Sequence, residues 1–519
     1  MSSQNRADAG SSVIVAVDQG TSATKALIMN AAGDILGRAH VSLTQQHPQP
    51  GWVEQDPLAI RDSVISAIGH SLKASDSKSV LGIGLSTQRE SIMIWDRATG
   101  QPLGPILGWQ DRRTAQRAKD LLSQGAGPLV ERVSGLPIDP MFSALKLQWL
   151  LDSVDPNRRL SLGGKIAAGT VDSWLVFCLT GQHRIEAGNA SRTQLMNLEA
   201  VDWDAELLDL FRVPTLVLPE IVASNEPSGP LTVSEAAGAP VCAVLGDSHS
   251  ALYAHGVREP GTVKATYGTG SSIMGLLTVA AQSAPLDGLV KTLAWHDGAP
   301  RYAFEGNILA TGATAMWLAQ VFEADVAHLD SLARTVESSG GVNIVPAFAG
   351  LGAPWWDERA EASISGFNLG TSGAHLARAA FESIALQIED VLAAAEKSIS
   401  TPIRSVLADG GPSSNSWLMQ LQSDLSQRTV LRSNVPDLSA LGVAHMAAIQ
   451  SGLCSADDIE VVPRSRTEVR PQMTAAEASA RKLSWSRAVA RARWTPPIET
   501  GFGDLHDASL ASTAKGTAT

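Results

Sequence analysis

The sequence predicts an α/β fold with two domains, each built on a mixed β-sheet that is covered by helices. Its 519 residues exceed the size at which one hydrophobic core keeps growing, so two cores are expected. The stretches VAVDQGTSATKALIM at 15–29 and VKATYGTGSSIMGLL at 263–277 both read as a strand, a glycine turn and a returning strand. The same strand–turn–strand unit in each half indicates two similar domains that face one another.

The first half begins with three predicted strands. A β-branched run at 13–17 stops at a glycine turn, the chain resumes as a strand at 25–29, and a further turn predicts a third antiparallel strand at 35–43. Apolar residues at helical spacing then predict a helix over 59–73, and a short apolar run predicts a strand over 80–86. Polar residues gather where these strands end.

The rest of the chain repeats the pattern. Buried strands are predicted at 241–245 and 405–408, and a strand pair at 262–267 and 272–277. The alanine-rich segment 374–396 has apolar residues at helical spacing, which predicts a long helix that covers the sheet.

The domain boundary is predicted in the sequence GVREPG at 256–261, which gives domains at 13–256 and 257–495. The small and polar residues at 497–519 predict a disordered tail.

Composition limits the partners. The formal net charge is -12 and no basic block opposes it, which argues against binding to nucleic acid or to anionic membranes. No run approaches the ~18 apolar residues of a membrane helix, and the polar N-terminus lacks a signal-peptide core. The three cysteines form no C-x-x-C pair. We expect a cytoplasmic protein with reduced thiols.

The first glycine turn is a candidate phosphate site. After Asp18, the residues Gly20, Thr21 and Ser22 allow backbone N–H groups to approach an anion, and Lys25 adds a positive charge. The alternative is a plain hairpin whose aspartate accepts backbone hydrogen bonds.

The second glycine turn makes the phosphate interpretation stronger. Gly268 and Thr269 repeat the device, and two such hairpins can clamp a polyphosphate from both sides. No G-x-x-x-x-G-K-[ST] sequence occurs, so a P-loop fold is disfavoured. Near 409, Gly410 and Gly411 would let a flat adenine lie against the backbone, although a strand-to-helix turn with a cap is the alternative.

Charged residues that directly follow a buried strand suggest a polyol site. Arg89 and Glu90 can donate to and accept from vicinal hydroxyls, and the Trp109 ring can lie against a carbon chain. The alternatives are a structural salt bridge at a strand end and a core tryptophan.

Asp247 is the candidate catalytic base. It ends a predicted strand and begins a helix, where it can take a proton from an attacking hydroxyl. The commoner role for such an aspartate is a helix N-cap. His249, two residues on, is also a possible base, but one histidine near an aspartate is more often structural.

In order along the chain, these segments resemble the FGGY carbohydrate kinases from 13 to 450. The motifs that carry the resemblance are DQGTSATKA, GWVEQDP, STQRESIMIWDRATG, WQDRRT, DPMFSALKLQWLL, GTVDSWL, NASRT, TYGTG, VPAFAGLGAPWWD and GGPSSN. The resemblance implies two actin-like, ribonuclease H-like ATPase domains with mixed sheets covered by helices, and an active site in the interdomain cleft.

The resemblance also implies roles for single residues, with ATP and Mg²⁺ as cofactors. Asp247 matches the catalytic base, and Asp18 and Asp247 match the carboxylates near the metal. Arg89, Glu90 and Trp109 match polyol-binding positions. The nucleotide-binding positions are matched by Thr21, Ser22, Lys25, Gly268, Thr269, Gly312, Gly410, Gly411 and Asn415. Lys25 stands where family members that phosphorylate glycerol have Arg, which keeps the charge but loses the planar fork.

Three departures from the glycerol-specific members concern the substrate. Met141 replaces Tyr, Ser272 replaces Phe and Ser248 replaces Gln, so two aromatic walls are lost. The expected pocket is longer, and Ser272 can bind an additional hydroxyl. We therefore expect phosphorylation of a terminal hydroxyl of erythritol.

Other outcomes stay open. Glycerol is the alternative substrate, followed by a pentitol or a pentulose. A non-enzymatic, nucleotide-dependent regulator is disfavoured because it would need none of the predicted polyol-binding and catalytic residues. We also expect a homo-oligomer, either a dimer or a tetramer.

Overall fold

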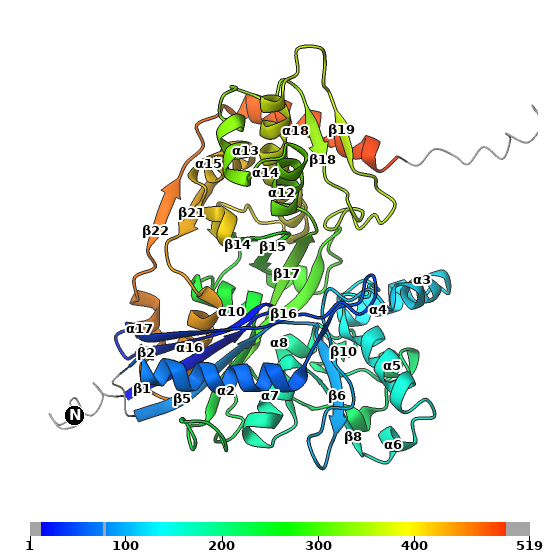
Figure 1. The fold of residues 1–519 in the computed structure, drawn as a ribbon, viewed down its shortest axis with the longest axis vertical. Helices are drawn as coiled ribbons and strands as arrows, with labels where there is room; N and C mark the ends of the chain where they lie inside the picture. The colour runs from blue at the N-terminus through cyan, green and yellow to red at the C-terminus, as the bar shows by residue number, and fades with distance from the viewer. Residues whose placement is uncertain (1–11, 76–78, 495–519) are drawn as a thin grey trace, which may run out of the picture.

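The structure is a computed structural model that describes residues 12–75 and 79–494 (Figure 1). The predicted tail at 497–519 lies outside the described residues. The chain forms a two-domain fold in which mixed sheets are covered by helices, as the sequence predicts.

The first domain is built on a five-stranded mixed sheet of order β13-β5-β1-β2-β3. Strands β1, β2 and β3 are antiparallel neighbours, while β1 pairs with β5 and β5 with β13 in parallel. The predicted strands of this half are confirmed. Their bounds are β1 Ser12–Gln19, β2 Ala23–Asn30, β3 Ile35–Ser42, β5 Ser79–Thr87 and β13 Val241–Gly246.

Helix α2, Pro57–Lys73, covers this sheet on the side of β2 and β3. The Asp56 side chain caps it by accepting from the Leu58 N–H, and proline begins the first turn, where it removes no needed donor. The apolar stripe that includes Ile60, Val64 and Ile68 is buried against the sheet.

The second domain contains a seven-stranded sheet of order β16-β17-β15-β14-β20-β21-β22. β14 and β15 are antiparallel, as β1 and β2 are, and β14 pairs in parallel with β20, as β1 does with β5. The predicted repetition of one device is therefore confirmed at the level of sheet topology. The bounds are β14 Thr262–Tyr267, β15 Ser271–Leu276, β16 Val290–His296, β17 Pro300–Ile308, β20 Ser405–Asp409, β21 Thr429–Ser433 and β22 Arg466–Val469.

Helices of the second domain enclose its main core. The predicted helix at 374–396 is α14, Gly373–Ile399, and it packs against α12, α13 and α15 in the upper part of Figure 1. Its neighbours are α12 Gly312–Val321, α13 Val326–Ala333, α15 Ser416–Ser426 and α18 Ala475–Ala492.

Smaller elements complete the described chain. A four-stranded sheet in the first domain consists of β4 Glu54–Gln55, β7 Ile106–Leu107, β6 Ile92–Asp96 and β8 Ile166–Thr170. The strand pairs are β9 Arg184–Glu186 with β12 Glu220–Val222, β10 Met196–Asn197 with β11 Asp202–Trp203, and β18 Asn343–Val345 with β19 Ser363–Ser365. The remaining helices are α3 Ala115–Ser123, α4 Gly127–Ser134, α5 Ser143–Val154, α6 Arg159–Leu162, α7 Val171–Thr180, α8 Ala187–Ala190, α9 Ala205–Leu210, η1 Thr215–Val217, α11 Val279–Gln282, η2 Gly411–Ser414 and α17 Ala456–Val461.

Two helices pack together where the domains meet. These are α10, Asp247–Ala254, and α16, Leu438–Gln450. The contact depends on Gly442, because an added Cβ would lie 1.9 Å from the Ser250 carbonyl oxygen. Although α16 belongs to the range predicted as the second domain, it packs on β1, β5 and β13 of the first sheet. Residues of both halves therefore share one apolar cluster.

No described helix is long and apolar enough to cross a membrane. All three cysteines are free thiols. Cys242 is buried, while Cys178 and Cys454 are half-buried.

Candidate active site

A cavity of about 890 Å³ lies between the two domains and is lined from both. Asp18 and Lys25 come from the first glycine hairpin, Asp247 from the start of α10, and Gly410 and Gly411 from the turn after β20. Parallel strands β1 and β5, and likewise β14 and β20, end at this cavity, which is why polar residues that follow the strands meet there.

Asp247 lies at the junction of β13 and α10. The N-cap of α10 is Gly246, so the predicted alternative of an Asp247 N-cap is wrong. Its Oδ1 accepts a hydrogen bond from the Ser248 N–H at 2.6 Å and lies 3.3 Å from the Arg89 Nε. Burial raises the pKa of Asp247, while Arg89 opposes this shift. A carboxylate with a raised pKa suits a group that accepts a proton near neutral pH.

Arg89 and Glu90 form no ion pair with each other among the described residues; each forms a buried salt bridge with another residue, as in the alternative considered for this strand end. Arg89 forms a bidentate pair with Glu305, with distances of 3.1 Å and 2.7 Å, whereas Glu90 accepts from the Arg192 Nε at 2.6 Å. Arg192 also lies 2.9 Å from Glu305. Each charge is thus compensated by a residue distant in sequence, and the two pairs formed by Glu305 join the two domains.

Glu305 is the centre of this buried network, and its side chain is fully buried. Although burial raises its pKa, the guanidinium groups of Arg192 and Arg89 hold the pKa of Glu305 well below its usual range. The Ser272 hydroxyl donates to Glu305 at 2.9 Å. Ser272 therefore lies beside Arg89, and both were predicted to bind the polyol.

The backbone at Glu90 is in the left-handed region, with φ 61°. The Ser143 hydroxyl donates to its carbonyl oxygen at 2.9 Å and holds this turn. A positive φ at a non-glycine residue is strained and occurs often at functional sites. The turn lets consecutive residues Arg89 and Glu90 contact different partners.

Trp109 and Met141 are two further residues predicted to bind the polyol, and neither is among the residues that line the cavity. Trp109 is exposed, so it is not a core residue. Its indole N–H donates to the Thr21 hydroxyl at 3.0 Å. Met141 is half-buried and packs against a small apolar cluster that contains Phe142. The buried Lys146 ammonium donates to the Met141 carbonyl and to the carbonyl of Gly108, the residue before Trp109. It therefore connects the segment of Met141 to the segment of Trp109.

Asp18 and Asp247 are the two carboxylates predicted to face a metal ion. Burial, and then the charge of Asp247, raise the pKa of Asp18 to about 7, although the Ser86 hydroxyl donates to it at 3.1 Å. Two carboxylates that repel each other in one cavity suit a divalent cation. The described residues contain no cluster of three or more His, Cys, Asp or Glu side chains that could hold a metal. The two carboxylates Asp18 and Asp247 fit Mg²⁺, which is commonly held by one or two carboxylates together with water and phosphate oxygens.

Lys25 has a protein partner in this structure. Its ammonium lies 2.9 Å from Asp437, which also lies 3.5 Å from Arg38. Lys25 still lines the cavity, as does Asp437. Ser22 is exposed at the tip of the same hairpin.

The structure brings the glycine turns of the second domain together. Gly312 donates its N–H to the Gly268 carbonyl at 3.0 Å, and an added Cβ at Gly312 would lie 2.5 Å from that oxygen. Gly410 has φ 89° and packs on the Tyr267 backbone. An added Cβ at Gly411 would meet no protein atom within 4 Å, so this backbone is open to the cavity. Thr269 is exposed at the tip of its turn.

Asn415 acts as a helix cap, the alternative considered for this segment. Its side-chain oxygen accepts from the N–H groups of Trp417 and Leu418, and its amide donates to Asp330 at 2.7 Å. Asn415 does not line the cavity between the domains.

Sequence reasoning missed four charged residues of the site: Arg192, Glu305, Lys264 and Asp409. Three of them lie on strands, and each strand buries its apolar neighbours. A charged residue inside an otherwise apolar strand was the available signal, because such a residue is rarely buried without a partner.

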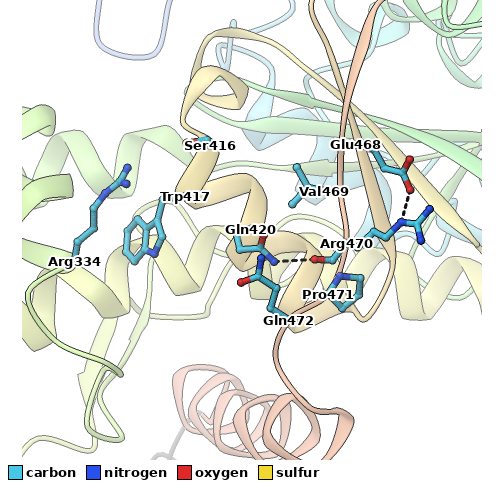
Figure 2. Close-up of a pocket in the computed structure, with 9 residues that line it drawn as sticks. All are labelled: Arg334, Ser416, Trp417, Gln420, Glu468, Val469, Arg470, Pro471 and Gln472. Atoms are coloured by element: carbon cyan, nitrogen blue, oxygen red, sulfur yellow. Dashed lines mark hydrogen bonds and ion pairs between the residues drawn. The ribbon is translucent and has the colours of Figure 1, made fainter.

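A second hollow, of about 700 Å³, lies on the second domain between α15 and the chain after β22 (Figure 2). Its walls include Trp417, Gln420 and Val469, and the exposed Arg470 pairs there with Glu468. None of the residues predicted for catalysis or binding lines it. The cavity between the domains is therefore the candidate active site.

Known proteins are similar to this chain over most of its length. Residues 13–254 match the N-terminal domain of the FGGY family of carbohydrate kinases, and residues 263–451 match its C-terminal domain. The chain is 39% identical to the apulose kinase of Pectobacterium atrosepticum over 492 residues, which cover 93% of this chain and 99% of that protein. It is 40% identical to the glycerol kinase of Chromobacterium violaceum over 489 residues, covering 92% and 98%.

Solved structures agree in fold. The glycerol kinase of Plasmodium falciparum, solved with ADP, superposes with a TM-score of 0.88 at 27% identity and covers 93% of this chain and 99% of that one. The gluconate kinase of Lactobacillus acidophilus superposes with a TM-score of 0.83 at 20% identity, covering 92% and 97%, which shows the fold alone. Because the models of both family domains match, at 13–254 and 263–451, the chain belongs to the FGGY family of carbohydrate kinases.

Proposed function

We propose that this enzyme transfers the γ-phosphoryl group of ATP to a terminal hydroxyl of a small polyol, with erythritol as the first candidate. The position of Asp247 is the observation that carries the proposal. It lines the same cavity as the glycine turn at Gly410, and it lies 3.3 Å from Arg89 of the polyol side. A base between acceptor and nucleotide is the geometry that phosphoryl transfer requires.

In the proposed reaction, Asp247 takes the proton from the attacking hydroxyl. The hydroxyl oxygen forms a bond to the γ-phosphorus, the bond from that phosphorus to the β–γ bridging oxygen breaks, and ADP leaves. Arg89 donates to the polyol hydroxyls and Glu90 accepts from them, while Trp109 packs on the carbon chain. The partners of Arg89 and Glu90, Glu305 and Arg192, fix the orientation of both groups.

The cofactors of the proposal are ATP and Mg²⁺. The glycine turns that contain Thr21, Gly268 and Gly410 would hold the phosphates through backbone N–H groups, with Lys25 as a cation. Asp18 and Asp247 would hold the metal, which neutralises charge on the phosphates when bound.

The choice of erythritol depends on Ser272 and Met141. Ser272 is small and presents a hydroxyl beside Arg89, where glycerol-specific members carry an aromatic ring. Met141 is flexible and half-buried in its cluster. A longer acceptor with one more hydroxyl fits the enlarged, polar side better than glycerol does.

Glycerol and a short ketose are the alternatives, because the similar proteins include a glycerol kinase and an apulose kinase. A pentitol or a pentulose is a further possibility. A regulator without kinase activity would not require Asp247 or the buried pairs of Arg89 and Glu90.

An ADP-release assay decides between these substrates. We expect the highest kcat/KM with erythritol among glycerol, erythritol, threitol, ribitol, xylitol, xylulose and apulose, with no release when Mg²⁺ is chelated. Preference for glycerol would overturn the enlarged-pocket proposal, and preference for a ketose would overturn the assignment to a polyol. A dimer or tetramer in the cytoplasm remains our expectation from the sequence, and light scattering measures the oligomeric state.

A further inference from the structure

Lys264 is a buried cation to which the proposed reaction assigns no role. It lies on β14 and none of its surface is exposed. Lys264 and Thr266, two residues apart, line the cavity between the domains, while Val263, Ala265 and Tyr267 face the core of the second domain. The strand therefore presents an ammonium group to the active site.

The ammonium of Lys264 has unused donors. A lysine has three N–H donors, and among residues 12–75 and 79–494 the structure gives it one acceptor, the Thr266 hydroxyl at 2.8 Å. It forms no ion pair within 4.0 Å with any carboxylate of those residues. Two donors of a buried ammonium that have no protein acceptor among those residues are available to an anion that enters the cavity.

The surroundings of Lys264 indicate where that anion lies. Burial lowers the pKa of Lys264, while the negative charges of Asp409, Glu305 and Asp247 in the same region oppose this shift. Asp409 is held by His255, whose Nε2 lies 2.8 Å from it, and Asp409 precedes the Gly410 turn. Lys264 thus lines the same cavity as the proposed base and the turn proposed to hold the nucleotide.

We propose that Lys264 binds the γ-phosphoryl group of ATP and is a further catalytic residue of this site. The inference rests on the proposed use of ATP. A compact ammonium suits a phosphate oxygen, because it acts as a point charge with several donors. Lys264 would hold the transferred group from the side of the second domain, opposite the first hairpin with Lys25.

Calorimetric titration of the full-length K264M variant tests this role. A non-hydrolysable ATP analogue and ADP are each titrated with Mg²⁺, with and without glycerol. A lost charge-assisted hydrogen bond should weaken binding of the analogue by about 10- to 100-fold. Binding of ADP, which lacks the γ-phosphoryl group, should change by less than about 3-fold, on the order of 0.6 kcal/mol.

Lys291→Met is the matched control, because Lys291 donates to the carbonyls of Gln282 and Ala284 and does not line the cavity. K291M should bind both nucleotides as the wild type does. Equal losses for the analogue and ADP in K264M, or no loss for either, would overturn the proposal. If K264M does not fold, K264Q is measured in the same way. Because the titration needs no phosphorylation, its outcome is independent of which polyol the enzyme accepts.

Discussion

At the scale of single residues, function depends on which charges meet. Adjacent Arg89 and Glu90 contact different domains, because the strained turn at Glu90 separates their side chains. The buried Glu305 of the second domain pairs with Arg89 and Arg192 of the first domain. Substitution of a member of this network should therefore affect activity more than substitution of an exposed charge.

Replacement of Asp247 by Asn tests the base. The amide keeps the size of the side chain but cannot accept the proton, so kcat should fall by about 10²- to 10⁴-fold. ATP affinity should remain within a few-fold of the wild type. An ADP-release assay measures kcat, and calorimetry measures the affinity for ATP. Asp202→Asn, at an exposed position on β11, is the control, and normal turnover in D247N would remove Asp247 from the mechanism.

Ser272→Phe tests the enlarged pocket. A ring at this position should fill the space next to Glu305 and shift the ratio of kcat/KM toward glycerol over erythritol by about 10-fold or more. Ser272→Ala removes the hydrogen bond to Glu305 but leaves the space, so its ratio should change little. An S272F enzyme that still prefers erythritol would contradict this interpretation.

The pKa of Asp18 predicts a pH dependence of metal binding. Burial and Asp247 raise that pKa to about 7, so the group is protonated below this pH and charged above it. Because a cation binds the charged form, its affinity should be constant above pH 7 and fall by about tenfold per pH unit below it. Electron paramagnetic resonance of Mn²⁺ with ADP measures this between acid and neutral pH. Asp18→Asn should weaken this dependence, leaving the part that comes from Asp247 and ADP, and a variant profile equal to that of the wild type would contradict the assignment.

At the scale of elements, the packing of α10 on α16 positions Asp247, the proposed base. α10 begins at Asp247, and α16 follows Asp437, the partner of Lys25. Gly442 allows α16 to approach Ser250, and Gly84 allows it to lie on β5, where an added Cβ would be 2.6 Å from the Val443 carbonyl oxygen. Both ends of the cavity therefore depend on this contact.

Gly442→Ala should separate these two helices. The added methyl group overlaps the Ser250 backbone, so the variant should lose about 1–3 kcal/mol of unfolding free energy and part of its activity. Urea denaturation measures the loss. Gly127→Ala, in the first turn of α4, meets its nearest atom at 3.4 Å and should not destabilise the protein. Equal stability of both variants would show that the helix contact is not tight.

At the scale of the whole molecule, the cavity is shared between two domains with the same strand device. Asp18 and Lys25 line it from one sheet, and Lys264 and Gly410 from the other. Closure of the domains would exclude water, which protects ATP from hydrolysis.

Small-angle X-ray scattering tests closure. The radius of gyration should decrease when a non-hydrolysable ATP analogue and a polyol substrate are added together, and less with either alone. The D247N enzyme allows the same measurement with ATP itself. An unchanged radius with both ligands would contradict closure of the cleft.

The sequence by itself determined the two-domain α/β fold, the repeated hairpins and the segments around Asp18, Arg89, Asp247 and Gly410. These features are local, because strand periodicity and glycine turns are written in neighbouring residues. Only the tertiary structure decided that Glu305 and Arg192 neutralise Arg89 and Glu90, that Asn415 caps a helix, that α16 covers the first sheet and that Lys264 faces the cavity. Charge partners distant in sequence are set by packing, which no local pattern encodes.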